Sequence, residues 1–490
     1  MNTRRFLIGW FTALCLLCSL LQPGTLLAQD DDGGDDDDGD DSGPVVSDDD
    51  GGDDGDDDGD DDGPAPAPPP PASDDDDDDG PAPAPPVSDD VSDDDDDTQS
   101  PDLDFDDDDD DGEDRPVPNQ VLVQLASGVD AEAFAARYGA SVLRIIPVPN
   151  IALLQLDPDR DDDAELAALL ADADLTWGEP NVTSQAPEGR PRYFFSSANG
   201  EPQLVDGPAL PEGLEFTPAE ACVTGDSVVV AVLDTGVDVA HPALAANVLP
   251  TGVNMLENTF DVRDVPNGID DDNDGQADEM VGHGTHVAGT VLQVAPDAAI
   301  LPVKVLDSDG VGDTFSVTAG MYYAVEQGAD VINLSLGTTY ESIAIQAAVD
   351  NAASQGVIVV AATGNGDRSL PVEYPASATS VISVASTTAD ADKASYSNYN
   401  ELVDISAPGD SVSSAYPDGR YSSASGTSMS TPIVAGAIAL ILERQPDAAA
   451  ESVYALLEST SGPLSLSDPA LEGMLGAGEV DLDAAISCSG

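Results

Sequence analysis

The 490-residue sequence contains few basic residues and very little histidine. It has 14 Lys and Arg against 97 Asp and Glu, a formal net charge of −83, and only 3 His. A chain this acidic repels phosphate groups, so its charge excludes nucleic acid and anionic membranes as partners. A solvated acidic surface explains the excess of acid, and so does life in a salty or calcium-rich medium; both explanations stay open.

Cysteine is also scarce, and two of the 4 Cys lie in an apolar run near the N-terminus. Arg4 and Arg5 precede "FLIGWFTALCLLCSLL", and "LLA" stands just before Gln29. This is the pattern of a secretory signal peptide over residues 1–28, since the run is short for a membrane anchor and no stop-transfer pattern follows. We therefore expect a secreted protein whose mature chain has no membrane span.

Loss of the signal peptide leaves two cysteines, Cys222 and Cys488, at the two ends of one region. An exported protein meets an oxidising compartment, so we expect a disulfide between them. Two buried free thiols are the alternative.

Residues 29–114 offer almost nothing to a hydrophobic core. They consist of aspartate runs, "DDG" repeats and two "PAPAP" spacers. Such a segment cannot bury enough apolar surface to offset the entropy of ordering it. We expect a disordered acidic tract that acts as a spacer, with loose calcium binding as the alternative.

The composition becomes ordinary from residue 115 onward. The apolar patterns predict strands at 120–125, 150–157 and 175–181 and helices at 130–140 and 163–174, which make a small α+β domain over residues 115–187. Residues 188–221, rich in Pro, Gly and Ser, predict a linker. From residue 222 to 490, apolar runs without alternation, such as "SVVVAVLD" and "GVIVVAATGN", alternate with helical patterns. This indicates an α/β domain with a mostly parallel sheet.

Three chemically active side chains stand at junctions between strands and helices of that domain. Asp234 ends a buried strand, His283 lies where a polar loop enters a helix, and Ser428 directly precedes a helix. Sites in parallel sheets collect at such junctions. A serine hydroxyl needs a base to take its proton, and the base needs an acid to orient it, so this set predicts nucleophilic acyl transfer.

Each of these residues also has an alternative reading. The "DTG" at Asp234 occurs in aspartic proteases, which need a second such carboxylate. His283 and His286 have the spacing of zinc ligands, but no glutamate lies between them. Ser428 could be a helix N-cap. The combination of all three, in this order, favours the catalytic reading.

The segments "VVVAVLDTGVD", "GHGTHVAGT" and "SASGTSMSTPIVAGAIALIL" resemble the signatures of the subtilisin-like serine proteases, the subtilases, in that family's chain order. The resemblance implies a subtilisin-like three-layer α/β fold with a mostly parallel central sheet. It makes Asp234 the orienting acid, His283 the general base and Ser428 the nucleophile. It also makes Asn365, in "AATGNGD", the side-chain donor of the oxyanion hole.

The same resemblance assigns residues to substrate and to an inhibitor. Ser335, Leu336 and Gly337 match the edge on which the family binds substrate as an added strand. Glu373 falls where the family has a small residue at the base of the pocket for the side chain before the cut bond, so a preference for Arg or Lys is expected, with self-cleavage near Arg190 and Arg192. Residues 115–187 resemble the family's propeptide, a small ferredoxin-like domain that folds the protease and then inhibits it.

The acidic stretch "DDDNDGQADE" lies just before His283. Asp270, Asp272, Asp274 and Asp278 occupy the first, third, fifth and ninth places of an EF-hand-like loop. Its twelfth place is Val281, and Glu279 could supply the missing carboxylate. A structural Ca²⁺ is therefore predicted, with a solvated acidic loop as the alternative.

These patterns together predict a secreted serine endopeptidase that acts on protein or peptide substrates. It would be made as a self-processing zymogen with a processing site in the linker. A non-catalytic, calcium-loaded acidic surface protein and a metallopeptidase built on the His pair are the competing classes.

Overall fold

The computed structural model describes residues 115–158, 162–187, 202–211, 214, 216 and 222–486, which all fall in one compact unit. The predicted signal peptide and acidic tract lie outside the described residues, as do Arg190, Arg192 and Cys488.

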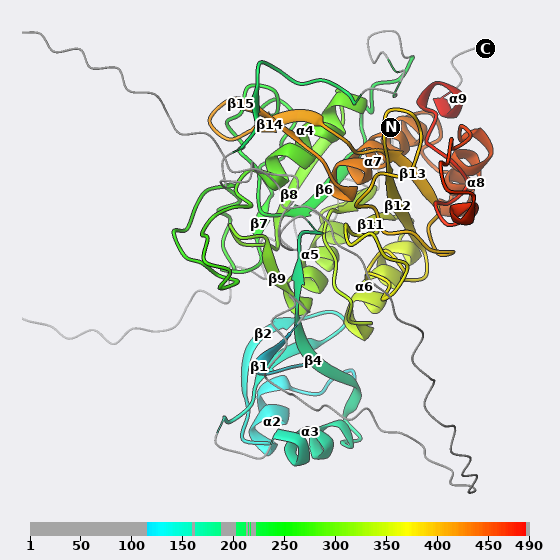
Figure 1. Ribbon diagram of the computed structural model, residues 1–490. Helices are drawn as coiled ribbons and strands as arrows, with labels where there is room; N and C mark the ends of the chain where they lie inside the picture. Colours follow the sequence, from blue (N-terminus) through cyan, green and yellow to red (C-terminus); the bar gives the residue numbers. More distant parts are fainter. Residues whose placement is uncertain are drawn as a thin grey trace, which may run out of the picture. The chain divides into compact units, whose positions relative to one another are not determined.

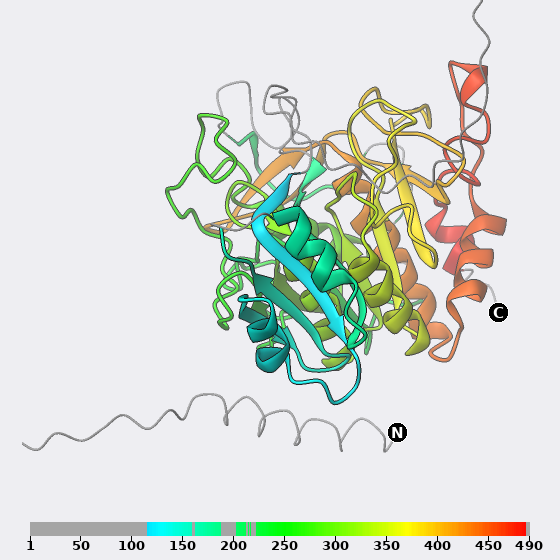
Figure 2. The same cartoon turned by 90° about the horizontal axis from the view of Figure 1, so that it is seen from below.

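A small α+β domain comes first along the described chain. Its elements are β1 (Pro116–Leu125), α2 (Ala131–Arg137), β2 (Ser141–Ile146), β3 (Ile151–Gln155), α3 (Asp162–Leu170) and β4 (Leu175–Gln185). The four strands pair antiparallel in the order β2-β3-β1-β4. Both helices lie on the same face of this sheet (Figure 2), where Phe134 and Leu169 pack against Val123 and Leu154. This is the predicted ferredoxin-like arrangement.

One strand of this domain, β2, was not among the predicted elements. Its apolar side chains give no clear signal because Leu143 and Ile145 are exposed and only Ile146 is buried. The strand is held at the sheet edge by its pairing with β3.

A seven-stranded parallel sheet forms the centre of the larger domain (Figure 1). The order is β13-β12-β11-β10-β6-β8-β7, and all six pairs of neighbouring strands are parallel. The strands are β6 (Val229–Asp234), β7 (Val253–Asn254), β8 (Ala299–Lys304), β10 (Val331–Leu334), β11 (Ile358–Ala362), β12 (Val381–Thr387) and β13 (Ile405–Pro408).

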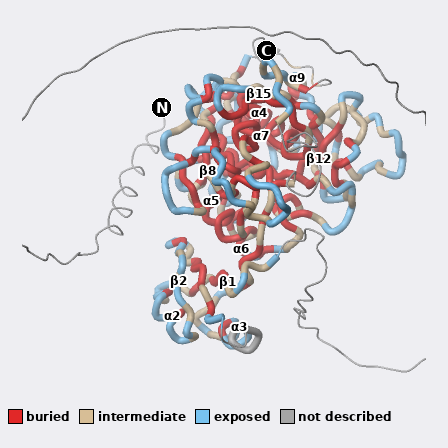
Figure 3. The backbone as a smooth tube through the Cα atoms, turned by 60° about the vertical axis from the view of Figure 1, so that its left-hand side comes forward, coloured by how far each residue is buried: buried red, intermediate tan, exposed pale blue. Residues whose placement is uncertain are grey.

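Helices cover both faces of this sheet. The main ones are α4 (His283–Val294), α5 (Thr314–Glu326), α6 (Ile343–Ser354) and α7 (Thr427–Arg444), followed by α8 (Ala450–Thr460) and α9 (Leu482–Ile486). In β6, Val230 and Val232 belong to the core that contains α4 and α7, whereas Ala231 and Leu233 belong to the core that contains α5 and α6. The strand is apolar without alternation because both faces are buried. Figure 3 shows that buried residues fill the centre of the larger domain. The predicted three-layer α/β fold is confirmed.

Short strands complete the described chain. β14 (Val412–Tyr416) and β15 (Arg420–Ala424) form an antiparallel hairpin that β5 (Leu204–Val205) extends. β5 falls inside the predicted linker, where a two-residue strand gives no periodic pattern. β9 (Val311–Asp313) pairs with β4 and so adds a fifth strand to the sheet of the small domain. Among the described helices, none is both long and apolar enough to cross a bilayer.

Candidate active site

The predicted catalytic residues gather at the carboxyl edge of the parallel sheet. Asp234 is the last residue of β6, Ser335 directly follows β10, and Asn365 lies three residues beyond β11. These three strands are neighbours in the sheet. His283 is the first residue of α4 and Ser428 the second residue of α7.

Asp234 and His283 form a hydrogen-bonded pair. The distance from His283 Nδ1 to Asp234 Oδ1 is 2.7 Å, and both side chains are essentially fully buried. An ionised carboxylate can only accept, so Nδ1 carries the hydrogen of this bond. In a neutral ring the other nitrogen, Nε2, is then the one that can take a proton.

A glycine after His283 lets helix and strand approach this closely. A Cβ on Gly284 would stand 2.2 Å from the carbonyl oxygen of Gly236 and 3.0 Å from Asp234 Oδ1. Any side chain at this position would push the start of α4 away from the end of β6. The "GHGTH" spacing is thus a packing requirement of the Asp–His pair.

A second buried aspartate, Asp264, braces the pair, and no sequence motif pointed to this residue. Its Oδ1 accepts from Gly282 N (2.9 Å) and Thr235 Oγ1 (3.2 Å), and its Oδ2 accepts from Thr285 N (3.1 Å) and Thr285 Oγ1 (2.6 Å). These donors flank Asp234 and His283. Burial raises the pKa of Asp264, an effect that its donors and the charge of Lys304 oppose.

Lys304, one of only two lysines in the chain, lies at the end of β8 beside this network. Its Nζ donates to the carbonyl oxygens of Thr235 and of Leu306, the latter at 2.9 Å. Burial lowers its pKa, and the charges of Asp264, Asp307 and Asp234 act in the opposite direction. The ammonium group places positive charge next to the buried carboxylates.

Ser428 is held by the chain that leaves β10. Its Oγ donates to the Ser335 carbonyl oxygen at 3.3 Å. Four residues later, Pro432 lacks the N–H that would normally bond to the Ser428 carbonyl. Ser335 Oγ replaces that donor at 2.9 Å, and it accepts in turn from Asn333 Nδ2 at 3.0 Å. Ser335 therefore fixes the turn that carries Ser428.

Asn365 is oriented by the same helix start. Its Oδ1 accepts from Thr427 N and from Thr427 Oγ1, both at 2.9 Å. This fixes Nδ2 as the donor end of the side chain. The Ser428 N–H belongs to the first turn of α7, whose N–H groups have no acceptor within the helix and lie at its positive end.

Asn398 supports the turn that contains Asn365. Its Nδ2 donates to Thr363 O at 2.8 Å, and its Oδ1 accepts from Gly366 N (2.9 Å) and Arg368 N (3.2 Å). Asn398 is buried and lies more than 30 residues away in sequence, so no local pattern could have identified it.

The side chains of His283 and His286 bond to different groups rather than to one common ligand. His286 Nε2 lies 3.0 Å from the Val412 carbonyl oxygen, whereas His283 bonds to Asp234. His241 Nε2 lies 2.8 Å from Arg420 O. The three histidines thus bond to different partners, which argues against the zinc alternative.

Gly337 already pairs with a strand of the small domain. Gln185 N donates to Gly337 O and Gly337 N donates to Gln185 O, each at 2.9 Å, and Ala186 N donates to Gly310 O at 2.9 Å. The end of β4 is therefore held as an added strand between two segments of the larger domain. Leu336, between Ser335 and Gly337, is fully buried.

Glu373 is buried close to the same edge. A Cβ on Gly337 would stand 3.2 Å from Glu373 Oε2, and a Cβ on Gly364 would stand 2.8 Å from Glu373 Cγ. The side chain thus fills space between the segments that follow β10 and β11. Its Oε1 accepts from Arg368 Nη2 at 2.8 Å.

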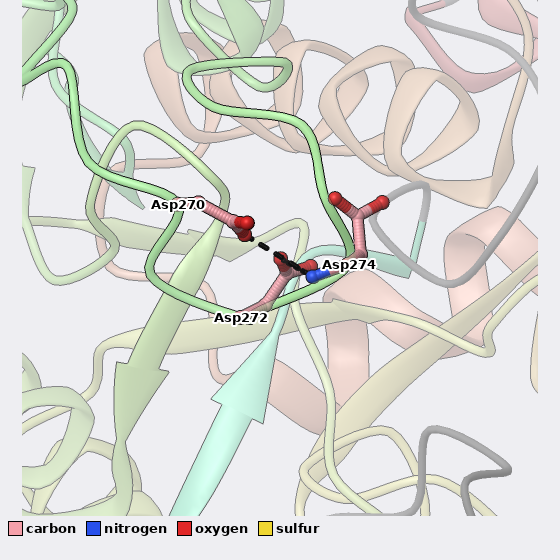
Figure 4. A group of neighbouring side chains, drawn as sticks. All are labelled: Asp270, Asp272 and Asp274. Carbon is pink, nitrogen blue, oxygen red and sulfur yellow. Dashed lines mark hydrogen bonds between the residues drawn. The ribbon is translucent and has the colours of Figure 1, made fainter.

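The acidic loop, residues 267–279, brings three of its five predicted metal ligands together. Carboxylate oxygens of Asp270, Asp272 and Asp274 lie within 4.8 Å of one another. Figure 4 shows the side chains of Asp270 and Asp272 directed at the backbone N–H of Asp274, and each accepts from it at 3.1 Å.

The other two predicted ligands of the acidic loop have different surroundings. Asp278 Oδ1 accepts from Asn267 N (2.6 Å) and Gly268 N (3.0 Å) and so closes the loop. Burial raises the pKa of Glu279 to about 8, and the charges of Asp309, Asp272 and Asp274 add to the shift. Buried Asp309 accepts from the N–H groups of Asp271, at 2.5 Å, and Asp278. Sequence spacing did not reveal Asp309, which belongs to the loop after β8.

Cys222 is disulfide-bonded. Its predicted partner lies outside the described residues, so the pairing stays a prediction.

A buried aspartate–histidine pair at the carboxyl edge of a parallel sheet, with a serine at a helix start on that edge, is the residue set of a serine hydrolase. The family model described as "Subtilase family" matches residues 225–478, and that of the "Fervidolysin N-terminal prodomain" matches residues 106–181. The chain therefore belongs to the subtilase family, as its motifs predicted, and is a subtilisin-like serine endopeptidase with an N-terminal prodomain.

Individual relatives agree with this assignment. Thermitase from Thermoactinomyces vulgaris is 38% identical over 282 residues, which cover 56% of this chain and 91% of thermitase. Subtilisin BL from Lederbergia lenta is 37% identical over 290 residues, covering 56% of this chain and 98% of that protein. Fervidolysin from Fervidobacterium pennivorans, described as a keratinolytic enzyme related to subtilisin, shares the fold with a TM-score of 0.61 at 24% identity. That match covers 77% of this chain and 62% of fervidolysin, so this chain spans less than two thirds of it.

Proposed function

We propose that the chain is an exported, self-processing serine endopeptidase whose triad is Asp234, His283 and Ser428. The observation that carries this proposal is the buried 2.7 Å bond between Asp234 Oδ1 and His283 Nδ1, at the sheet edge where Ser428 begins α7. That bond selects the tautomer in which Nε2 can act as a base.

Each step of peptide hydrolysis has a residue suited to it. Ser428 Oγ attacks the peptide carbonyl carbon while His283 Nε2 takes the hydroxyl proton and then passes it to the departing amine. Asn365 Nδ2 and the Ser428 N–H donate to the oxyanion that forms. Water then repeats the sequence on the acyl-enzyme and releases the acid product.

The prodomain serves as the enzyme's own inhibitor in this proposal. The two backbone bonds between Gln185 and Gly337 are those that an added substrate strand would form at this edge. As long as they persist, a substrate cannot pair with Gly337. Processing in the 188–221 linker, followed by release of the prodomain, would free the edge.

Calcium at the acidic loop would support the base. The carboxylates of Asp270, Asp272 and Asp274 converge, and such groups repel one another unless a proton or a cation intervenes. Burial and neighbouring carboxylates raise the pKa values of Asp272 and Glu279, and oxygen ligands of this kind suit Ca²⁺. Asp270, Asp272 and Asp274 would hold the ion, with Glu279 as a further carboxylate. The loop leads directly to His283, so a bound ion would steady the entry to α4.

Export rests on the sequence pattern of residues 1–28 and on the disulfide state of Cys222, which fits an oxidising compartment. The Cys222–Cys488 pairing belongs to the same proposal.

Active-site labelling tests the proposal. A fluorophosphonate probe should label the full-length chain, and Ser428→Ala should abolish both the labelling and the mass change that marks self-processing. Ser430→Ala is a matched control, because it removes a buried hydroxyl in the same helix whose hydrogen bond goes to the Ala407 carbonyl oxygen, away from the proposed triad. Labelling or processing that survives in Ser428→Ala would refute the assignment of the nucleophile.

A further inference from the structure

Two chain segments lie beside the proposed nucleophile. One follows β10 and contains Ser335 and Gly337; the other follows β11 and contains Gly364. Gln185 pairs antiparallel with Gly337, so the residue two places further along a bound strand comes opposite Ser335. Ser335 is hydrogen-bonded to Ser428, so the carbonyl group of the strand residue opposite Ser335 comes next to the nucleophile.

Glu373 lies between these two segments and is paired with Arg368. Glu373 contacts the positions of both glycines, is 7% exposed and bonds to Arg368 at 2.8 Å. The Arg368 side chain is 34% exposed. Its aliphatic part packs against Gly366, since a Cβ added to Gly366 would stand 3.1 Å from Arg368 Cδ. A carboxylate this deeply buried is costly unless a cation accompanies it.

The backbone of Arg368 is fixed from both sides. Its N–H donates to Asn398 Oδ1 at 3.2 Å, and its carbonyl accepts from Tyr399 N at 3.1 Å. Asn398 also holds Gly366 N, so the guanidinium group extends from a braced turn. The pair is therefore built into the fold together with the turn that carries Asn365.

We propose that Arg368 is a specificity-determining residue for the reaction assigned to Ser428 under the proposed function. It cancels the charge of Glu373 at the floor of the pocket, so the side chain before the cut bond meets a neutral ion pair. An Arg or Lys substrate brings a second cation toward Arg368 and has no unpaired carboxylate to bind. The enzyme therefore cleaves after uncharged residues in preference to basic ones, contrary to what Glu373 alone would suggest.

Peptides that differ only in the residue before the cut test this selectivity. Full-length wild type, Arg368→Met, Glu373→Gln and the double variant are assayed on Arg, Lys, Leu and Glu peptides, and kcat/KM ratios are compared within each enzyme. Arg368→Met should raise the Arg/Leu ratio about tenfold or more, because the carboxylate loses its partner. Glu373→Gln should lower Arg/Leu and raise Glu/Leu, and the double variant should restore both ratios. Arg263→Met, which removes the exposed partner of Asp261, should leave them unchanged.

Two results would overturn the proposal: an Arg368→Met enzyme that cleaves the Leu peptide with an unchanged Arg/Leu ratio, or a wild type that strongly prefers Arg to Leu. If Arg368→Met does not cleave the Leu peptide, Glu373→Gln decides, and an unchanged Glu/Leu ratio there refutes the role of the pair. Failure of the proposed function looks different, because the wild type and Arg263→Met would then neither label with fluorophosphonate nor cleave any peptide.

Discussion

Glu179, in strand β4 of the prodomain, provides the sharpest test of how the two domains interact. Its buried carboxylate accepts from Ser342 Oγ (2.7 Å), Ile343 N (2.8 Å) and Ala344 N (3.0 Å). These donors form the N-terminus of α6, where first-turn N–H groups lack acceptors within the helix. Glu179 thus caps a helix of the catalytic domain from the prodomain.

Truncation of this carboxylate, in Glu179→Ala, removes the acceptor of three hydrogen bonds. Burial raises the pKa of Glu179 and the three donors oppose the shift, so we attribute the contact's strength to the three hydrogen bonds and none of it to the charge. At about 0.5–1.5 kcal/mol for each bond, the contact should weaken by about 1.5–4.5 kcal/mol. This corresponds to local opening that is roughly 10- to 1,600-fold more frequent.

Native-state hydrogen exchange measures that opening directly. The experiment uses the full chain with Ser428→Ala, which prevents self-digestion, and follows the peptide that contains Ile343 and Ala344. Glu179→Ala should speed exchange of these amides by the factor above, whereas Glu132→Ala, on the exposed side of α2, should not. Equal exchange in the two variants would refute the cap and the energy assigned to it.

Three further predictions concern the catalytic domain. Asn365→Ala should lower kcat by about 10²–10³ with little change in KM, a magnitude borrowed from a subtilisin oxyanion donor; steady-state kinetics that show only a KM effect would contradict the role. In the Ser428→Ala chain stripped of metal by a chelator, calcium added back at 100 times its Kd should raise Tm by about 3–5 °C; Asp270→Asn with Asp272→Asn should abolish the rise, and an undiminished rise would place the ion elsewhere. Burial raises the pKa of Glu479, whose carboxylate accepts a hydrogen bond from Thr387. The folded state therefore holds this proton more tightly than the unfolded state, and ionisation of the carboxylate lowers the stability of the fold as pH rises above about 4.3. Glu479→Gln should therefore match wild type in thermal melts near pH 4 and exceed it at pH 8; a difference that does not change with pH would refute this.

The fold could be predicted from sequence, and the three proposed catalytic residues could be located in it, because the signals around them are local and long. Strand β6 is an unbroken apolar run that ends in Asp234, and "GHGTHVAGT" carries its own packing constraint in Gly284. Elements without such signals were missed. β2 exposes its apolar side chains, and β5 is two residues long.

The side chains that hold the site together could not be predicted, because they act across large separations in sequence. Asp264 connects the flanks of Asp234 and His283, Asn398 braces the turn of Asn365, and Arg368 pairs with Glu373. Ligand spacing in the acidic loop was informative for Asp270, Asp272 and Asp274. It gave no indication that Asp278 would bond to the N–H groups of Asn267 and Gly268.

Strand β4 links docking of the prodomain to occlusion of the site. Glu179, which anchors the strand on α6, and Gln185, which occupies the backbone of Gly337, lie six residues apart in one extended segment, about 20 Å. Because β4 is extended and paired with β9 near Gln185, a displacement of the strand at Glu179 also displaces Gln185. Under the proposed function a substrate would need the same N–H and C=O of Gly337, so binding of the prodomain strand and of substrate would exclude each other. Loosening at Glu179 should therefore raise access to the active site even though Glu179 touches no catalytic residue.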